Sequence, residues 1–154
     1  MPVPHLIVGP TGSGKKSHTI EELIAAEKRA CGPTVAIWGI EPGGSRLAGL
    51  DRTVGADQAV QLLTEAAAIA AERLGRGREH EPTAAEPRIR IVIDGAEPVL
   101  CQDEAAHLLK VLALTGRKGS VETVLAVSDS SLQSWPYGLR HGPVTELHRR
   151  PRTT

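Results

Sequence analysis

Aromatic side chains are scarce in this chain of 154 residues, since phenylalanine is absent and aromatic residues make up only 2%. Hydrophobic residues nevertheless reach 40%, so a core must be built from leucine, isoleucine, valine and alanine. The length is that of about one domain and is enough to bury such a core. With 23% charged residues, the composition is that of an ordinary soluble globular protein.

The chain also lacks an excess of either charge, because 18 Lys and Arg residues balance 18 Asp and Glu residues. A net charge of zero gives no support for an electrostatic nucleic-acid binder, although it leaves room for a local basic patch. No apolar run approaches the roughly 20 residues that a membrane span needs. The N-terminus has no basic segment followed by an apolar core, as a signal peptide would. We therefore expect a cytoplasmic protein without a membrane segment.

Cysteine is rare as well, and Cys31 and Cys101 lie far apart with no CxxC motif and no cluster with histidine. This arrangement predicts two reduced, half-buried thiols rather than a disulfide or a metal site. The six histidines likewise lack the spacing of metal ligands.

Short β-branched runs alternate with helical patterns along the chain. Strands are expected at residues 5–8, 34–40, 88–94, 121–127 and 144–148. A first helix should end at Gly32, and a third should cover residues 103–114. For the second helix Asp57 is the expected N-cap, and one apolar face is formed by Val60, Leu63, Ala67, Ala70 and Leu74. The order predicts an α/β fold with a mostly parallel sheet that helices cover on both faces.

In such sheets, ligands bind at the carboxyl ends of the strands. Val8, Ile40, Asp94 and Ser128 end or follow four of the predicted strands, so we expect them on one edge. Residues 1–148 form a single domain in this interpretation, with a polar, exposed loop at about residues 75–88. Residues 149–154 are a basic tail, for which contacts to DNA phosphates and a frayed, solvated end are both open interpretations.

The segment GPTGSGK at residues 9–15 fits the phosphate-binding pattern GxxxxGK, with a strand before it and a helix that begins inside it. Glycines let backbone N–H groups converge on phosphate oxygens, and the helix N-terminus adds partial positive charge. Lys15 would reach the β- and γ-phosphates. The candidate nucleotide-binding residues are Gly9, Pro10, Thr11, Gly12, Ser13, Gly14, Lys15, Lys16 and Ser17.

The position after Lys15 departs from this pattern. It normally carries a Ser or Thr whose hydroxyl coordinates Mg²⁺, and here it is Lys16. An ammonium group has no lone pair for a cation and repels one. Ser17 comes one residue late, which on a helix is a rotation of about 100° away from the site. Either the loop shifts its register by one residue or metal binding is impaired, and the sequence favours impairment.

The strand RIRIVID ends in Asp94, which matches the Walker B position and is the candidate metal residue. Its carboxylate would hold Mg²⁺ through water, and the alternative is that it caps the turn before Gly95. Lys15 and Asp94 are the candidate catalytic residues. In P-loop motors a Glu usually follows the Walker B Asp and orients the attacking water. Here the following residue is Gly95, which has no side chain. Glu97 is a poor substitute unless the loop bends back.

The segments GPTGSGK, WGIEPGG, IVIDGAEPVL and LLKVLALTGRKGSVETVLAVS occur in an order that resembles the FtsK/SpoIIIE family of DNA-translocating ATPases. The resemblance covers about residues 4–127. It implies a three-layer, RecA-like P-loop NTPase core, ATP with Mg²⁺, a homo-hexameric ring and double-stranded DNA in the central pore. Arg117 and Arg140 are candidates for its trans-acting arginine, with solvated surface arginines as the simpler interpretation.

Four departures from the family pattern affect the chemistry. Lys16 replaces the hydroxyl residue, Gly95 the catalytic Glu, and Gly43 a Lys after the second strand. The pair Val127-Ser128 stands where a Thr-Gln pair would sense the γ-phosphate. The hypothesis is an ATP-binding domain related to DNA translocation or conjugative DNA transfer, with weak or absent hydrolysis. The alternatives are an active hexameric ATPase, a non-catalytic nucleotide-binding module that associates with a full-length translocase or with DNA, and a truncated remnant. Whether the chain is an enzyme stays open.

Overall fold

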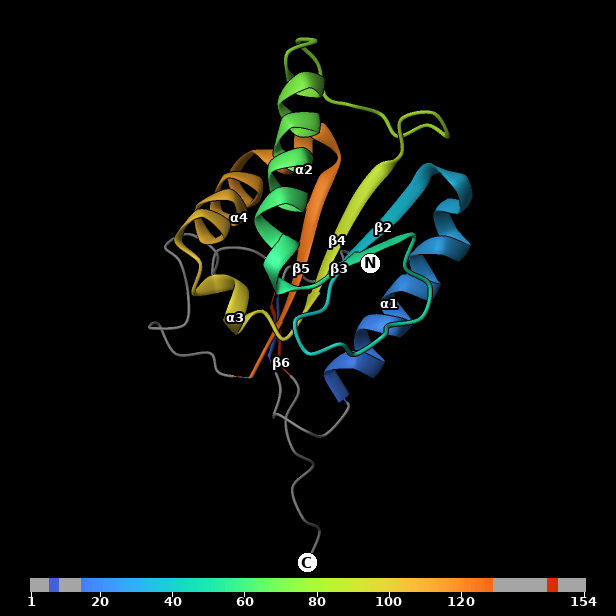
Figure 1. The fold of residues 1–154 in the computed structure, drawn as a ribbon. Coiled ribbons are helices and arrows are strands. Elements are labelled where there is room, and N and C mark those ends of the chain that lie inside the picture. The colour runs from blue at the N-terminus through green and yellow to red at the C-terminus, as the bar shows by residue number, and fades with distance from the viewer. Residues whose placement is uncertain (1–5, 9–14, 129–143, 147–154) are drawn as a thin grey trace, which may run out of the picture.

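In the computed structural model, residues 6–8, 15–128 and 144–146 are described. They contain one parallel sheet with the strand order β3-β2-β4-β5-β1-β6 (Figure 1). The strands are β1 (Leu6–Val8), β2 (Val35–Ile40), β3 (Arg52–Val54), β4 (Arg88–Asp94), β5 (Val121–Val127) and β6 (Val144–Glu146). The helices are α1 (Lys15–Cys31), α2 (Ala59–Leu74), α3 (Glu97–Leu100) and α4 (Asp103–Thr115), with 3₁₀ turns at Gly32–Thr34, Ala56–Gln58 and Gly116–Gly119.

Helices cover both faces of the sheet, with α1 on one side and α2 and α4 on the other (Figure 1). Because side chains alternate along a strand, β4 serves both layers. Its Ile91 packs in the cluster under α2 and α4, whereas Val92 packs in the cluster under α1. The predicted α/β fold with a parallel sheet covered on both faces is therefore confirmed. None of the described helices is both long and apolar enough to cross a membrane.

One prediction about α2 is wrong, and another is confirmed in part. Asp57 lies in the 3₁₀ turn before the helix, and the N-cap is Gln58, which makes no side-chain capping hydrogen bond. The buried face overlaps the predicted one, since Leu63 and Ala70 are buried, but it is turned so that Val60, Ala67 and Leu74 are only half-buried. It consists of Ala59, Leu62, Leu63, Ala66, Ala70 and Arg73. This face includes a buried arginine because two carbonyl groups from other segments accept its hydrogen bonds, which sequence periodicity does not reveal.

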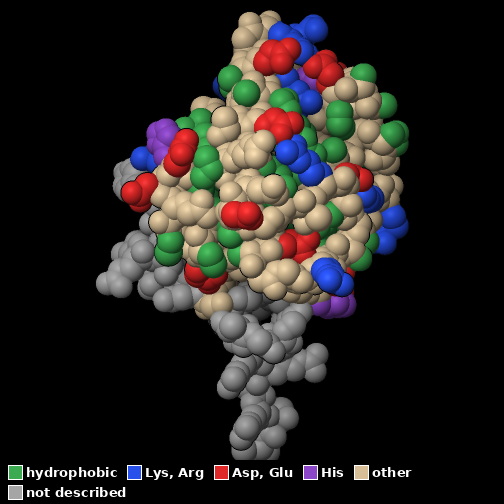
Figure 2. All heavy atoms as spheres, in the orientation of Figure 1, with side chains coloured by type: hydrophobic (Ala, Val, Ile, Leu, Met, Phe, Trp, Pro, Cys, Tyr) green, Lys and Arg blue, Asp and Glu red, His purple; other side chains and the backbone are tan. Residues whose placement is uncertain are grey.

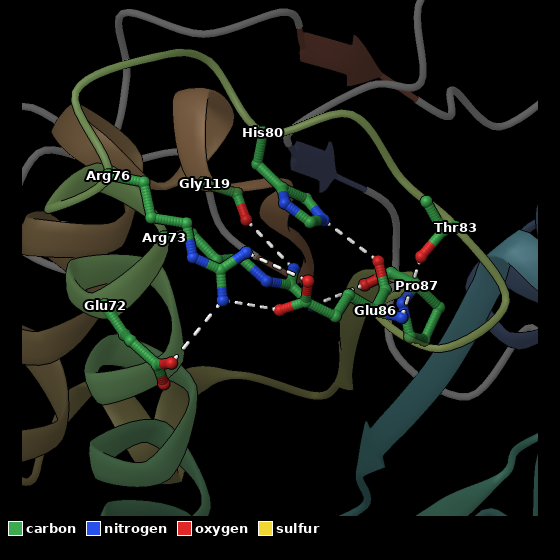
Figure 3. Close-up of polar contacts among 8 residues, drawn as sticks. All are labelled: Glu72, Arg73, Arg76, His80, Thr83, Glu86, Pro87 and Gly119. Atoms are coloured by element: carbon green, nitrogen blue, oxygen red, sulfur yellow. Dashed lines mark hydrogen bonds and ion pairs between the residues drawn. The ribbon is translucent and has the colours of Figure 1, made fainter.

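That arginine helps to fix the predicted loop at residues 75–88 (Figure 3). The Arg73 guanidinium donates to the carbonyl oxygens of Gly119 at 3.0 Å and Pro87 at 2.9 Å. Arg76 donates to both carboxylate oxygens of Glu86, at 2.9 and 2.6 Å. Most side chains between these anchors are exposed, as predicted. The loop is nonetheless tied to the amino ends of β4 and β5, at the edge of the sheet opposite Asp94.

The thiol prediction holds in part. Both cysteines are free, but only Cys31 is half-buried, whereas Cys101 is exposed in the short segment between α3 and α4.

Candidate functional site

The predicted site edge is formed where β4, β5 and β1 end side by side. The strand order places β5 between the other two, and the register pairs Val8 with Val127 and Asp94 with Ala126. Ile40 pairs with Ile93 on the far side of β4, so it reaches the same edge. The chain therefore brings the end of β1, which leads to the Gly-rich segment, within two strands of Asp94.

Ser17 meets Asp94 at this edge. The Ser17 hydroxyl donates a hydrogen bond to Asp94 Oδ2 at 2.6 Å, although the residues are 77 positions apart in the sequence. Asp94 is 9% exposed and Ser17 is half-buried. The expectation that Ser17 turns away from the site is therefore wrong. Ser17 shares the sheet-facing side of α1 with Ile20 and Ile24, which follow it at helical spacing and are buried.

The turn after Asp94 is held by β5. The backbone N–H groups of Gly95 and Ala96 donate to the carbonyl oxygen of Ala126 at 3.1 and 2.8 Å. The turn is thus closed by a backbone acceptor, and the Asp94 carboxylate remains with Ser17. Gly95 has a φ of +78°, a conformation that side chains other than glycine rarely adopt. A glutamate at position 95 would therefore strain this turn.

The loop after Asp94 bends back and brings Glu97 to the site edge. The sequence made this bend the condition under which Glu97 could substitute for the missing catalytic Glu. Its Oε1 accepts a hydrogen bond from the backbone N–H of Ser128, the residue after β5. Figure 1 shows α3, which begins with Glu97, at the same end of the sheet as the start of α1. A second carboxylate consequently lies at the site edge, with one of its oxygens occupied.

Several predicted residues lie outside the part of the chain that the structure describes: Gly9, Pro10, Thr11, Gly12, Ser13, Gly14 and Arg140, together with the basic tail. Lys15 and Lys16 are the first two residues of α1, and their side chains also fall outside the description. Arg117 is exposed in the 3₁₀ turn before β5, at the edge opposite Asp94.

A buried carboxylate that the sequence did not single out organises the segment after β2. Glu41 is 8% exposed and accepts hydrogen bonds from Thr53 Oγ1 at 2.7 Å, the Leu47 N–H at 2.9 Å and Ser45 Oγ at 3.0 Å. Burial acts to raise the pKa of Glu41, but these hydrogen bonds together hold that pKa below its usual value. Glu41 also lines a cavity of about 490 Å³ with Arg46. Because its oxygens are already used by these donors, we interpret Glu41 as a structural brace.

Nothing in the described residues resembles a metal site built from protein alone, since they contain no group of three His, Cys, Asp or Glu side chains that could hold an ion. The site edge instead offers a carboxylate and a hydroxyl at the start of a 17-residue helix. The N–H groups at the helix N-terminus attract negative oxygens, whereas the Asp94 carboxylate attracts a cation, so the arrangement suits an anionic ligand that carries a cation.

Solved ATPase structures have a similar fold. The cytoplasmic domain of the type VII secretion ATPase EccC from Thermomonospora curvata matches with a TM-score of 0.76 at 19% identity, over 93% of this chain and 20% of that one. The pCW3 conjugation coupling protein TcpA, as a monomer with ATPγS, matches with a TM-score of 0.65 at 19% identity, over 91% and 47%. ATPases 2 and 3 of EssC from Geobacillus thermodenitrificans match with a TM-score of 0.64 at 13% identity, over 87% and 29%.

At these identities the likeness shows the fold alone, which is the predicted α/β, RecA-like fold of these ATPase domains. The chain spans less than half the length of each of these three structures. No protein-family model and no curated protein matches the sequence.

Proposed function

We propose that the chain is an ATP-binding domain of the FtsK/SpoIIIE type, related to DNA translocation or conjugative DNA transfer, with weak or absent hydrolysis. The contact between Ser17 and Asp94 is the observation that carries this proposal. It joins the first turn of α1, which begins at the last residue of GPTGSGK, to the acidic end of β4. The presence of ATPγS in the TcpA structure, which has a similar fold, supports the same assignment.

The proposed binding mode uses features of this chain. Phosphates would be held by the backbone of residues 9–14, by Lys15 and by the N-terminus of α1. Asp94 and Ser17 would then lie on the sheet side of the phosphates. ATP is proposed over other nucleotides because of the family resemblance.

Weak hydrolysis is proposed because of the residues that follow Asp94. Gly95 offers no carboxylate, and its positive φ disfavours any side chain at that position. One oxygen of Glu97 is occupied by the Ser128 N–H, so Glu97 is not free to orient water through it. Removing a single stabilising donor from a transition state costs a factor of about 10²–10³ in rate. Losing both a water-orienting carboxylate and a γ-phosphate sensor would therefore leave little turnover.

Partners are proposed on the same resemblance: double-stranded DNA, and either a homo-hexamer or association with a full-length translocase in the cytoplasm. On the face shown in Figure 2, acidic and basic side chains of the described residues are interspersed, so that face offers DNA no continuous basic surface. The fold match to EccC, a type VII secretion ATPase, favours a second candidate function, a nucleotide-binding domain that serves protein secretion.

Melting temperatures and phosphate release test the proposal together. ATP at a hundred times its dissociation constant should stabilise the fold by about 2.7 kcal/mol, which is a clear rise in melting temperature. We expect this rise in the natural chain and not in Lys15→Ala. We also expect the pure protein with Mg²⁺ and ATP to release almost no phosphate.

Two results would contradict the proposal in different ways. An unchanged melting temperature of the natural chain at millimolar ATP would reject nucleotide binding and favour the truncated remnant. Rapid phosphate release that Lys15→Ala abolishes would reject weak hydrolysis and leave an active ATPase.

A further inference from the structure

We propose that Ser17, rather than residue 16, supplies the hydroxyl that binds the Mg²⁺ of a bound Mg²⁺-nucleotide. Nucleotide binding by this chain is then Mg²⁺-dependent in spite of Lys16. The inference rests on the proposed nucleotide binding and assigns the metal-binding residue of the same site.

The first step is the chemistry of the pair. A serine hydroxyl has one donor and two lone pairs, so it donates to Asp94 while a lone pair remains for a cation. The observed 2.6 Å contact is this hydrogen bond, and it holds the hydroxyl oxygen against a buried carboxylate. Mg²⁺ prefers hard oxygen ligands of this kind. Ser17 and Asp94 therefore fit the metal that the family resemblance implies.

The second step concerns which metal complex fits. Two protein oxygens are too few for a metal cage, and no further cluster of His, Cys, Asp or Glu that could bind a metal occurs among the described residues. Mg²⁺ commonly uses one or two carboxylates and completes its shell with phosphate oxygens and water. The pair should therefore bind Mg²⁺ together with a nucleotide and only weakly without one.

The third step is that the position of Ser17 along α1 is fixed by packing. Ile20 and Ile24 are fully or almost fully buried against the sheet. One turn nearer the end of the helix, Glu27 Oε1 pairs with an Arg90 guanidinium nitrogen of β4 at 2.8 Å. A rotation of about 100° that exchanged residues 17 and 16 would pull all three side chains out of place. The one-residue shift of register is thus imposed by the sheet-facing side of the helix.

Calorimetric titration with ATP, in EDTA and in Mg²⁺, measures the metal contribution as the ratio of the two dissociation constants. We expect Mg²⁺ to tighten ATP binding to the natural chain by about tenfold or more, the lower end of the loss in metal affinity that follows when residues around a bound metal are mutated. Ser17→Ala should bring the ratio close to one, and Ser17→Thr should preserve it. His18→Ala, at the next and exposed position of α1, is the matched control and should preserve it too.

Ser17→Cys provides a second arm that does not depend on the stability of Ser17→Ala. A thiolate prefers softer metals, so Mg²⁺ should no longer tighten ATP binding to this variant, whereas Cd²⁺ should. The natural chain titrated with Cd²⁺ controls for binding at Cys31 and Cys101.

The outcomes separate this inference from the proposed function. Tight ATP binding whose Mg²⁺ ratio survives in Ser17→Ala overturns the assignment of Ser17. A ratio of one in the natural chain means that the metal site is impaired, and it overturns the inference while leaving nucleotide binding intact. An absence of ATP binding in both buffers overturns both proposals.

Discussion

Arg90→Ala is expected to destabilise the fold by about 3–5 kcal/mol, the usual cost of breaking a buried ion pair by removing one partner. Arg90 lies on β4 beneath α1, and its side chain is only 7% exposed. Its guanidinium donates to Glu27 at 2.8 and 2.9 Å and to Glu122 at 2.7 Å. Burial acts to lower the pKa of Arg90, but its two carboxylate partners hold that pKa above its usual value. Without the Arg90 cation, Glu27 loses its ion pair to β4, and Glu122 keeps only the longer pair with Arg88 at 3.4 Å.

A loss of that size is a large part of the roughly 5–15 kcal/mol by which domains are stable. Urea unfolding followed by circular dichroism measures it. Lys28→Ala is the matched control, because Lys28 and Asp51 form a pair that is 35% and 45% exposed and should contribute about 0–1 kcal/mol. Replacing Arg90 with Met and both glutamates with Leu removes the buried charges of this triad and leaves only the partly exposed Arg88, so it should restore most of the stability. A loss below that of Lys28→Ala would show that the buried network is not structural.

The second large effect is expected at Gly116, which ends α4. A Cβ atom there would lie 2.1 Å from the carbonyl oxygen of Val121, a backbone atom at the start of β5. That distance is far inside van der Waals contact, so the helix and the strand must separate. Overpacking of this kind usually costs about 1–3 kcal/mol, and occasionally more. We expect Gly116→Ala to lower the urea midpoint strongly.

Gly43→Ala controls for the loss of glycine itself. Gly43 is exposed, and no atom lies within 4 Å of the position that its Cβ would take. Its substitution should leave stability unchanged or raise it slightly, because alanine restricts the unfolded chain. If the two variants unfolded at the same urea concentration, the close approach of α4 to β5 would be disproved.

Local sequence patterns predicted most of the fold because they reflect burial. The apolar run that ends in Asp94 predicts a strand at residues 88–94, and β4 has the same bounds. The short strand β3 was missed, since its three residues contain no apolar run. It forms by pairing Arg52 with Trp38 in β2, where the guanidinium also lies 4.8 Å from the Trp38 ring centre. Such pairing depends on the neighbouring strand and leaves no periodic signal.

Part of the site could be predicted from local sequence patterns, and part depends on contacts between distant segments. Asp94 and the shared edge follow from parallel strands, whose carboxyl ends meet on one side. The orientation of Ser17 depends instead on how Ile20 and Ile24 seat α1 against the sheet, which a count along the loop motif cannot supply. The reach of Glu97 depends on the turn at Gly95 and its hydrogen bond to Ala126. Both are long-range packing effects.

Nucleotide is proposed to bind at the edge where α1 meets the end of β4. Amide hydrogen exchange with and without ATP locates bound nucleotide most directly. We predict slower exchange in peptides that cover residues 9–20 of the natural chain, and no change there in Lys15→Ala. No change in those peptides, or slower exchange only in residues 41–58 around the Glu41 cavity, would contradict the account.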